Sequence, residues 1–323
     1  MSGIKIVIGV DIGGTNTGFG LVEPSGKILA KDAMPTCAEQ PAEDFFRRLF
    51  EKIDRLLHEN PDRFDVCGVG IGAPNANYYT GRIENPPNLS WKIVDVVALV
   101  KKYMNVPVAL TNDANAAALG EMQFGNARGM KNFIEITLGT GLGSGIIVNG
   151  ELVYGHSGFA GEMGHLMIER NGGRVCGCGK RGCLEAYASA TGLARTAIEL
   201  LVTETDKSPL RAIPTSQITS KSVYEAAIAG DAIANKAFEI TGRLLGETLA
   251  NTVEYLSPEA IFLFGGMAAA GDLIFRPAKE HMEKNLLPIF RNKVKILPSG
   301  LAENEAAILG AAALIWHELS KND

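Results

Sequence analysis

The chain has 323 residues, 46% hydrophobic and 21% charged, which is the composition of a folded protein large enough for two domains. Its net charge of −5 argues against a protein that binds nucleic acid through clustered Lys and Arg. No window approaches about 18 consecutive apolar residues, and the N-terminus lacks the basic region of a signal peptide, so we expect a cytoplasmic protein without a membrane partner.

The first half alternates between strand and helix signals. An apolar, β-branched run at residues 4–10 leads through a glycine-rich turn at 11–16 into a second strand at 17–22. The periodicity of the apolar residues then predicts strands at 27–30, 65–71 and 106–111, and helices at 45–57, 91–103 and 114–124.

Residues 133–152 repeat this opening, because a second apolar run is again followed by a glycine turn and another strand. Asn149-Gly150 closes the repeat with the strongest short signal for a β-hairpin. Further elements are predicted as helices at 184–203, 222–255, 272–284 and 305–320, and as strands at 260–264 and 293–297. The alternation of strands and helices indicates the α/β class, with a duplicated unit.

Three glycine turns follow strands. Asp11-Ile12-Gly13-Gly14-Thr15 offers backbone N–H groups and a hydroxyl to an anionic oxygen, and Asp11 can hold a hydrated Mg²⁺. Gly139-Thr140-Gly141 occupies the same place in the repeat, and Gly265-Gly266 ends the strand at 260–264. A plain hairpin, or a simple helix entry at Gly265-Gly266, is the alternative. The Walker spacing is absent, and a strand rather than a helix follows the first turn.

Asn112-Asp113-Ala114-Asn115 lies between a strand and a helix. A helix N-cap explains one polar residue there, but not three in four positions. A carboxylate at this place could instead accept a proton from a substrate hydroxyl as it attacks phosphorus, which makes Asp113 a candidate general base.

His165, Cys176, Cys178 and Cys183 supply one imidazole and three thiols within a short segment. Four such ligands suit a tetrahedral Zn²⁺ with no open position, which is the form of a structural site. The alternatives are buried cysteines beside an unrelated histidine, or a zinc ribbon that binds nucleic acid. Glu162 and Glu185 flank the cluster and could accept hydrogen bonds from a polyol, or could be surface residues.

Together these motifs resemble those of the ROK family of bacterial sugar kinases and repressors, over essentially the whole chain. The first two glycine turns are similar to the family's phosphate loops, and Gly265-Gly266 is similar to its adenosine-side turn. Gly161-Glu162-Met163-Gly164-His165 resembles the Glu-x-Gly-His motif. The segment from Cys176 to Glu185 resembles the specific zinc signature of the family, whereas glycine loops are shared across the hexokinase–actin superfamily.

The resemblance implies a two-lobed, actin-like ATPase fold of duplicated ribonuclease H-like units with a cleft between the lobes. Residues 1–111 and about 305–323 would form the small lobe, and 112–304 the large lobe with the zinc loop. ATP and Mg²⁺ would be held by Asp11, Gly13, Gly14, Thr15, Gly139, Thr140, Gly141, Gly265 and Gly266. The sugar would be held by Asn88, Asn112, Asp113, Glu162, His165 and Glu185, with Asp113 as the base.

Within the family, Asn85-Pro86-Pro87-Asn88-Leu89-Ser90-Trp91 resembles a glucokinase segment. We therefore expect an ATP-dependent hexose kinase that phosphorylates the 6-hydroxyl of glucose. An N-acetylglucosamine or N-acetylmannosamine kinase, a fructokinase and a non-catalytic sugar sensor stay open. Gly72-Ala73-Pro74-Asn75 departs from the family, in which many members have Gly after Pro and in which this loop faces the sugar. Only ten residues precede Asp11, which favours a kinase over a repressor with an N-terminal DNA-binding domain; a homodimer or homotetramer is left open.

Overall fold

The computed structural model describes residues 3–59 and 63–321 as an α/β protein with two compact units. The first unit comprises Met1–Lys131, Gly145–Gly161 and Ser299–Asp323, and the second comprises Asn132–Ser144 and Glu162–Pro298. The division into lobes at residue 111 stays a prediction. Among the described helices, none has the length and apolar character needed to cross a membrane.

The first unit is built on a five-stranded sheet in the order β3-β2-β1-β4-β8. β2 pairs antiparallel with β1 and β3, whereas β1, β4 and β8 run parallel. The strands are β1 (Ile4–Ile12), β2 (Asn16–Val22), β3 (Ile28–Pro35), β4 (Phe64–Gly72) and β8 (Val108–Thr111). The carboxyl ends of β1, β4 and β8 therefore meet at one edge, where α/β proteins bind ligands.

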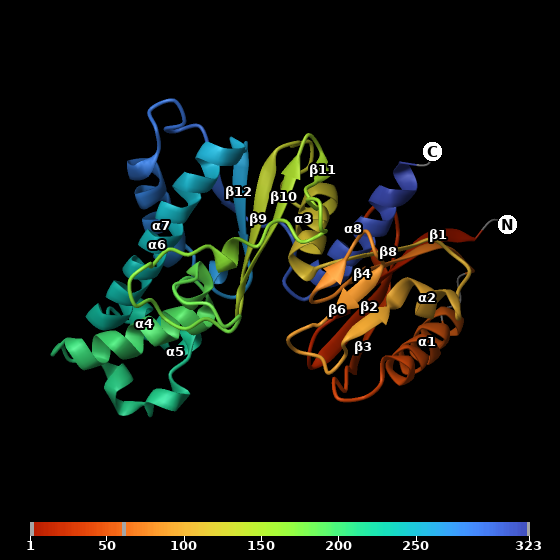
Figure 1. Cartoon of the computed structure of the whole chain (residues 1–323), viewed down its shortest axis with the longest axis horizontal. Helices are drawn as coiled ribbons and strands as arrows, with labels where there is room; N and C mark the ends of the chain where they lie inside the picture. The colour runs from red at the N-terminus through yellow and green to blue at the C-terminus, as the bar shows by residue number, and fades with distance from the viewer. Residues whose placement is uncertain (1–2, 60–62, 322–323) are drawn as a thin grey trace. The chain divides into compact units, whose positions relative to one another are not determined.

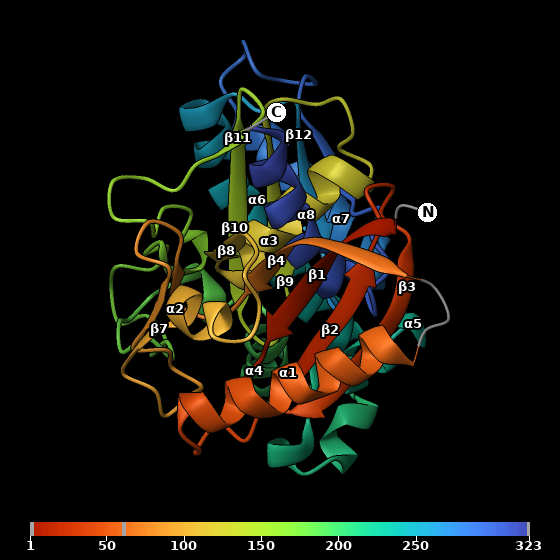
Figure 2. The same cartoon turned by 90° about the vertical axis from the view of Figure 1, so that its right-hand side faces the viewer.

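Helices cover both faces of this sheet. On one face, Ile6, Ile8 and Val10 form part of a core with Phe45 and Leu49 of α1 (Ala42–His58) (Figure 1 and Figure 2). On the other face, α8 (Ala306–Ser320) packs against β1 and β4, beside α3 (Asp113–Phe124).

Glycines let α8 approach the sheet closely. A Cβ at Gly9 would lie 2.4 Å from the carbonyl oxygen of Ile308, and one at Gly70 would lie 1.9 Å from that of Ala311. Because any larger residue would collide with the helix backbone, glycine at these two strand positions fixes the distance of α8 from the sheet.

The second five-stranded sheet has the order β11-β10-β9-β12-β13. Its strands are β9 (Phe133–Leu138), β10 (Leu142–Val148), β11 (Glu151–Leu152), β12 (Ala260–Phe264) and β13 (Lys295–Pro298), and β9, β12 and β13 are parallel. This order matches that of the first sheet strand by strand, which confirms the duplication expected from the repeat. Asn149 and Gly150 have φ of 55° and 81° and close the β10–β11 hairpin, as predicted.

Four helices belong to the second unit: α4 (Ala190–Thr203), α5 (Ser220–Ile228), α6 (Ala232–Leu256) and α7 (Asp272–Asn285). The single helix predicted at 222–255 is therefore wrong. Gly230 adopts φ of 88°, and Asp231 caps the new helix by accepting from the Ala234 N–H at 2.8 Å. The helix predicted at 184–203 likewise starts later, after a short 3₁₀ turn, because the Ser189 hydroxyl caps α4.

A small three-stranded sheet, β5-β6-β7, follows β4 in the chain. Its strands are β5 (Ala76–Asn77), β6 (Arg82–Glu84) and β7 (Ile93–Asp95), and α2 (Val96–Lys101) comes next. The helix predicted at 91–103 is thus correct only in its centre. Asp95 ends the strand and caps α2 through the Ala98 N–H at 3.0 Å.

Candidate functional site

The first glycine turn joins β1 to β2, and a hydrogen bond from Thr36 holds it in place. The Gly13 N–H donates to the Asn16 carbonyl at 3.0 Å, and the Thr36 hydroxyl donates to the Gly13 carbonyl at 2.7 Å. A Cβ at Gly14 would lie 2.8 Å from Cβ of Asn88, so glycine is needed for these two predicted site residues to lie side by side. The turn presents Thr15 to solvent.

The polar residues at the start of α3 have separate tasks. The Asn112 side chain is the N-cap and accepts from the Asn115 N–H at 2.7 Å, while buried Asn115 donates to the Thr111 hydroxyl at 3.2 Å. Asp113 accepts from the Ala114 N–H at 2.9 Å, and water still reaches its side chain. Of the three, Asp113 is therefore the group that is open to a substrate.

Asp11 and Asp113 place two carboxyl groups near each other, and the pKa of each is raised. Burial raises the pKa of Asp11 to about 7, and the charge of Asp113 adds to this shift. Burial of its carboxyl group also raises the pKa of Asp113, although the hydrogen bond from the Ala114 N–H opposes the change. Gly72 lies beside both residues, since a Cβ there would be 3.7 Å from Asp11 Oδ1 and 3.9 Å from Asp113 Cα. A carboxylate pair in this setting suits a divalent cation such as Mg²⁺.

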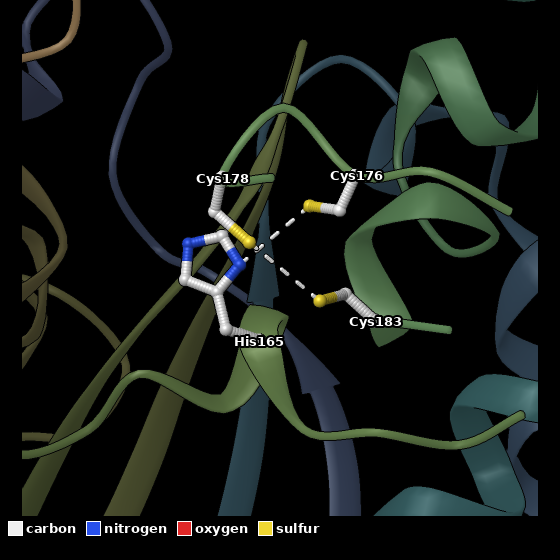
Figure 3. A group of neighbouring side chains, drawn as sticks. All are labelled: His165, Cys176, Cys178 and Cys183. Atoms are coloured by element: carbon white, nitrogen blue, oxygen red, sulfur yellow. Dashed lines mark hydrogen bonds between the residues drawn. The ribbon is translucent and has the colours of Figure 1, made fainter. Parts of the chain in front are cut away.

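His165, Cys176, Cys178 and Cys183 converge in the second unit (Figure 3). Their ligand atoms all lie within 4.8 Å of one another, with 3.7 Å from His165 Nδ1 to Cys176 Sγ and 3.7 Å between the sulfurs of Cys178 and Cys183. Sulfurs bound to one tetrahedral Zn²⁺ are about 3.8 Å apart, so the donor set fits that ion.

The three thiols must lose their protons before they can bind zinc. Burial raises the pKa of Cys176 to about 12 and raises that of Cys183. Burial acts in the same direction on Cys178, but the Lys180 N–H and the neighbouring thiols lower its pKa. Because zinc binds thiolates, a dication at the centre would offset the cost of ionising all three groups.

Two glycines shape the loop that carries the cysteines. Gly179 and Gly182 have φ of 86° and 75°, and a Cβ at Gly182 would lie 1.9 Å from the Glu169 carbonyl oxygen. Gly177 differs from them, because its φ is not positive and a Cβ there would meet open space.

The two ring nitrogens of His165 have different neighbours. While Nδ1 lies among the thiols, Nε2 lies 4.0 Å from Glu162 Oε2. Both residues come from a 3₁₀ turn, Met163–His165, and the residue before it. Gly164 lets this turn approach β10, since a Cβ there would lie 2.2 Å from the Leu142 carbonyl oxygen. The structure thus places Glu162 beside His165.

Glu185 links the cysteine loop to the second glycine turn. Its Oε2 accepts from the Leu142 N–H at 2.9 Å, and its Oε1 accepts from Cys176 Sγ at 3.3 Å. A Cβ at Gly141 would lie 2.4 Å from Oε2, so glycine makes room for the carboxylate. Glu185 is therefore fixed between two predicted binding elements rather than free on the surface.

The second and third glycine turns are neighbours. Thr191 donates to the Thr140 carbonyl at 2.9 Å, which ties the second turn to the start of α4. Gly265 adopts φ of 96°, and a Cβ there would lie 2.8 Å from the Leu138 carbonyl oxygen. Because β9 and β12 are paired in parallel, Gly139 and Gly265 come from the same ends of adjacent strands.

The family model for the ROK family matches residues 7–318. The chain belongs to the ROK family. It is 37% identical to the glucokinase of Halalkalibacterium halodurans over 95% of this chain and 94% of that protein. It is 28% identical to the xylose repressor of Bacillus spizizenii over 97% of this chain and 77% of the repressor. A crystal structure of a ROK family glucokinase from Streptomyces griseus, in complex with glucose and AMPPNP, has a TM-score of 0.79, 33% identity and coverage of 96% and 98% of the two chains.

Sequence reasoning missed Arg174, which organises the cysteine loop of this ROK protein. Its guanidinium lies 4.4 Å from the centre of the Tyr187 ring and donates to the carbonyl of Ala186 at 2.9 Å. It also donates to Glu199 of α4 at 3.0 Å. A single arginine before the first cysteine has no motif, and only the folded loop reveals that Arg174 anchors it beside Glu185.

Proposed function

We propose that this ROK protein is an ATP-dependent glucokinase that transfers the γ-phosphoryl group of ATP to the 6-hydroxyl of glucose. The observation that carries the proposal is the carboxylate of Asp113 at the start of α3, near Asp11 and the first glycine turn. The glucokinases among its relatives supply the reaction class and the sugar.

Asp113 would take the proton of the sugar hydroxyl as the oxygen attacks phosphorus. A carboxyl with a raised pKa is a better proton acceptor than an ordinary aspartate, provided that it is ionised at the working pH. Asp11 would hold Mg²⁺, which neutralises charge on the phosphates. N–H groups of Gly13 and Gly14 and the Thr15 hydroxyl would donate to phosphate oxygens.

The second unit would contribute to both substrates. Gly139, Thr140 and Gly141 would bind phosphates, and Gly265 and Gly266 would bind the adenosine side of ATP. The residues proposed to bind the sugar are Glu162, His165 and Glu185 in the second unit, and Asn88 and Asn112 in the first unit.

We also infer a structural zinc on His165, Cys176, Cys178 and Cys183. Three thiols and an imidazole at tetrahedral spacing leave no position for substrate, so the metal would stabilise the loop that carries Glu185. We also propose a cytoplasmic location, since a cysteine cluster that holds zinc as thiolates suits a reducing compartment. Assembly as a homodimer or a homotetramer stays a prediction that light scattering after gel filtration tests.

A coupled assay of ATP consumption with purified protein tests the proposed function. The panel contains glucose, N-acetylglucosamine, N-acetylmannosamine, fructose and xylose, each with Mg²⁺-ATP, and the product is analysed by NMR for the phosphorylated position. We expect glucose to give the highest kcat/KM and phosphate at the 6-position. A higher kcat/KM for an N-acetylhexosamine or for fructose would overturn the choice of sugar.

The xylose repressor among the relatives favours a sugar sensor as the second candidate. A sensor would bind a sugar without consuming ATP. Calorimetric binding of xylose or glucose together with no ATP turnover on any sugar of the panel would support the sensor and contradict the kinase.

A further inference from the structure

The loop that follows β4 begins beside the proposed base. The Ala73 N–H donates to the carbonyl of Thr111 at 3.0 Å, and Thr111 directly precedes Asn112-Asp113. Ala73 itself is fully buried, so this end of the loop is fixed. The sequence then reaches Asn75, at the position where the ROK resemblance leads us to expect glycine.

Asn75 adopts φ of 52°, a left-handed conformation that asparagine tolerates better than most residues. Its side chain is what glycine would lack. Nδ2 donates to the carbonyls of Glu84 at 3.1 Å and Asn85 at 3.0 Å, and the Asn75 carbonyl accepts from the Glu84 N–H at 3.0 Å. Asn75 therefore makes two hydrogen bonds to Glu84, the last residue of β6, and one to Asn85, which follows it.

These bonds fix the start of the segment that carries Asn88. Asn85, the residue after β6, has φ of 48°, and Asn88 follows three residues later. At its far end the segment contacts the first glycine turn, where Asn88 lies close to Gly14. Residues 84–88 thus run from the Asn75 side chain to the proposed phosphate loop.

We propose that Asn75 is a positioning residue of the hexose site, whose amide orients Asn88 by holding the carbonyls of Glu84 and Asn85. This inference rests on the proposed function. Glycine at this position would allow the same backbone but would leave both carbonyls without their donor. The Asn75 side chain thereby connects the loop after β4 to residues 84–88, a connection that a flexible glycine would not make.

Two substitutions separate the side chain from the backbone. Asn75→Gly keeps the positive φ and removes both side-chain hydrogen bonds. Asn75→Asp keeps the size but replaces the donor with a carboxylate facing two carbonyl oxygens. We expect the hexose KM to rise about 3- to 10-fold in Asn75→Gly, the scale of one or two hydrogen bonds, and further in Asn75→Asp. In both variants kcat and the KM for ATP should stay within about two-fold of wild type, since the base and the glycine turns keep their own contacts.

The control is Asn292→Gly. Asn292 is exposed and also has a positive φ, of 59°, but it belongs to the other unit. It should leave the hexose KM unchanged, and calorimetry without ATP should show weaker hexose binding only for the Asn75 variants. An unchanged hexose KM and affinity in both Asn75 variants would overturn the positioning role. Equal loss of kcat and of hexose and ATP binding would instead indicate a general structural role. A wild-type protein that phosphorylates no hexose would contradict the proposed function, whereas hexose binding by calorimetry would still test the role of Asn75.

Discussion

Asp11 of β1 and Asp113 at the start of α3 both lie beside Gly72 of β4, and the pKa of Asp11 is raised by burial and by the charge of Asp113. Burial is the larger cause of this shift. Without a cation, the folded protein therefore holds a proton on Asp11 up to a pH of about 7, whereas the unfolded chain releases it near the ordinary pKa of 3.8.

This shift predicts how Asp11→Asn changes stability. Between pH 4 and 7 the unfolded wild type ionises Asp11 and the folded state does not, so wild-type stability falls as pH rises. The amide that replaces the carboxyl cannot ionise, and the variant should gain up to about 4 kcal/mol over wild type at pH 8 and nothing at pH 4. Urea unfolding in EDTA at both pH values measures this difference.

Asp32→Asn is the control for that measurement. The hydrogen bond and charge of Lys52 lower the pKa of Asp32, which has the opposite sign. This exposed aspartate should therefore give no gain at pH 8. Equal stability of Asp11→Asn and wild type at pH 8 would contradict the prediction that the ionised form of Asp11 destabilises the folded protein.

Asp113→Asn tests the proposed base. The amide keeps the shape and the acceptor oxygen for the Ala114 N–H but cannot take a proton. We expect kcat to fall by at least ~10²-fold while sugar affinity stays within a few-fold of wild type. Steady-state kinetics and glucose calorimetry on the same preparation check both values, and near-normal turnover would remove Asp113 from the base role.

Elemental analysis should find one zinc ion per chain in the wild-type protein, and the Cys178→Ser variant should lose this ion. Since structural zinc contributes to folding directly, this variant should also unfold at a lower temperature. Cys67→Ser is the matched control, because Cys67 lies on β4 in the first unit, outside the ligand cluster. A metal-free wild type that is fully active and melts at the same temperature as the zinc-bound protein would contradict the structural role of zinc.

His165→Cys separates the metal from the sugar. The new thiolate could still complete the zinc site, but it has no counterpart of Nε2, the atom that lies near Glu162. We expect the variant to retain zinc, to raise the glucose KM up to ~10-fold, as for one lost hydrogen bond, and to leave the KM for ATP unchanged.

The zinc content of the His165→Cys preparation decides how its kinetics are interpreted. A zinc-replete enzyme with an unchanged glucose KM would limit His165 to metal binding. Loss of zinc from this variant would show that the new thiol does not replace the imidazole as a ligand. The glucose KM would then be measured for His165→Gln with added metal and compared with that of wild type.

Features encoded within one short segment could be predicted from the sequence. The glycine turns, the Asn149-Gly150 hairpin and the cysteine cluster each depend on residues that are close in the chain, and the repeated sheet order follows from the repeated turn. Helix ends were less predictable at residues 229–231, where one glycine and one cap outweigh the continuous apolar periodicity on both sides.

Contacts between distant residues could not be predicted. The Thr36 hydroxyl that holds Gly13 is 23 positions away in the chain. Buried Glu121 accepts hydrogen bonds from Asn126 and from Ser299 and Gly300, nearly 180 positions later. Nothing in the local pattern around Glu121 distinguishes it from a surface residue of α3, since its partners are defined only by the fold.

The close packing of α8 on Gly9 and Gly70 has a consequence for synthesis on the ribosome. The first unit needs α8 to cover one face of its sheet, so this unit cannot complete its core until α8 has been synthesised. Every residue of the second unit has been made by Pro298. Since domains fold as units during synthesis, the second unit can fold first, and the exposed sheet of the first is the part that chaperones would have to protect in the nascent chain.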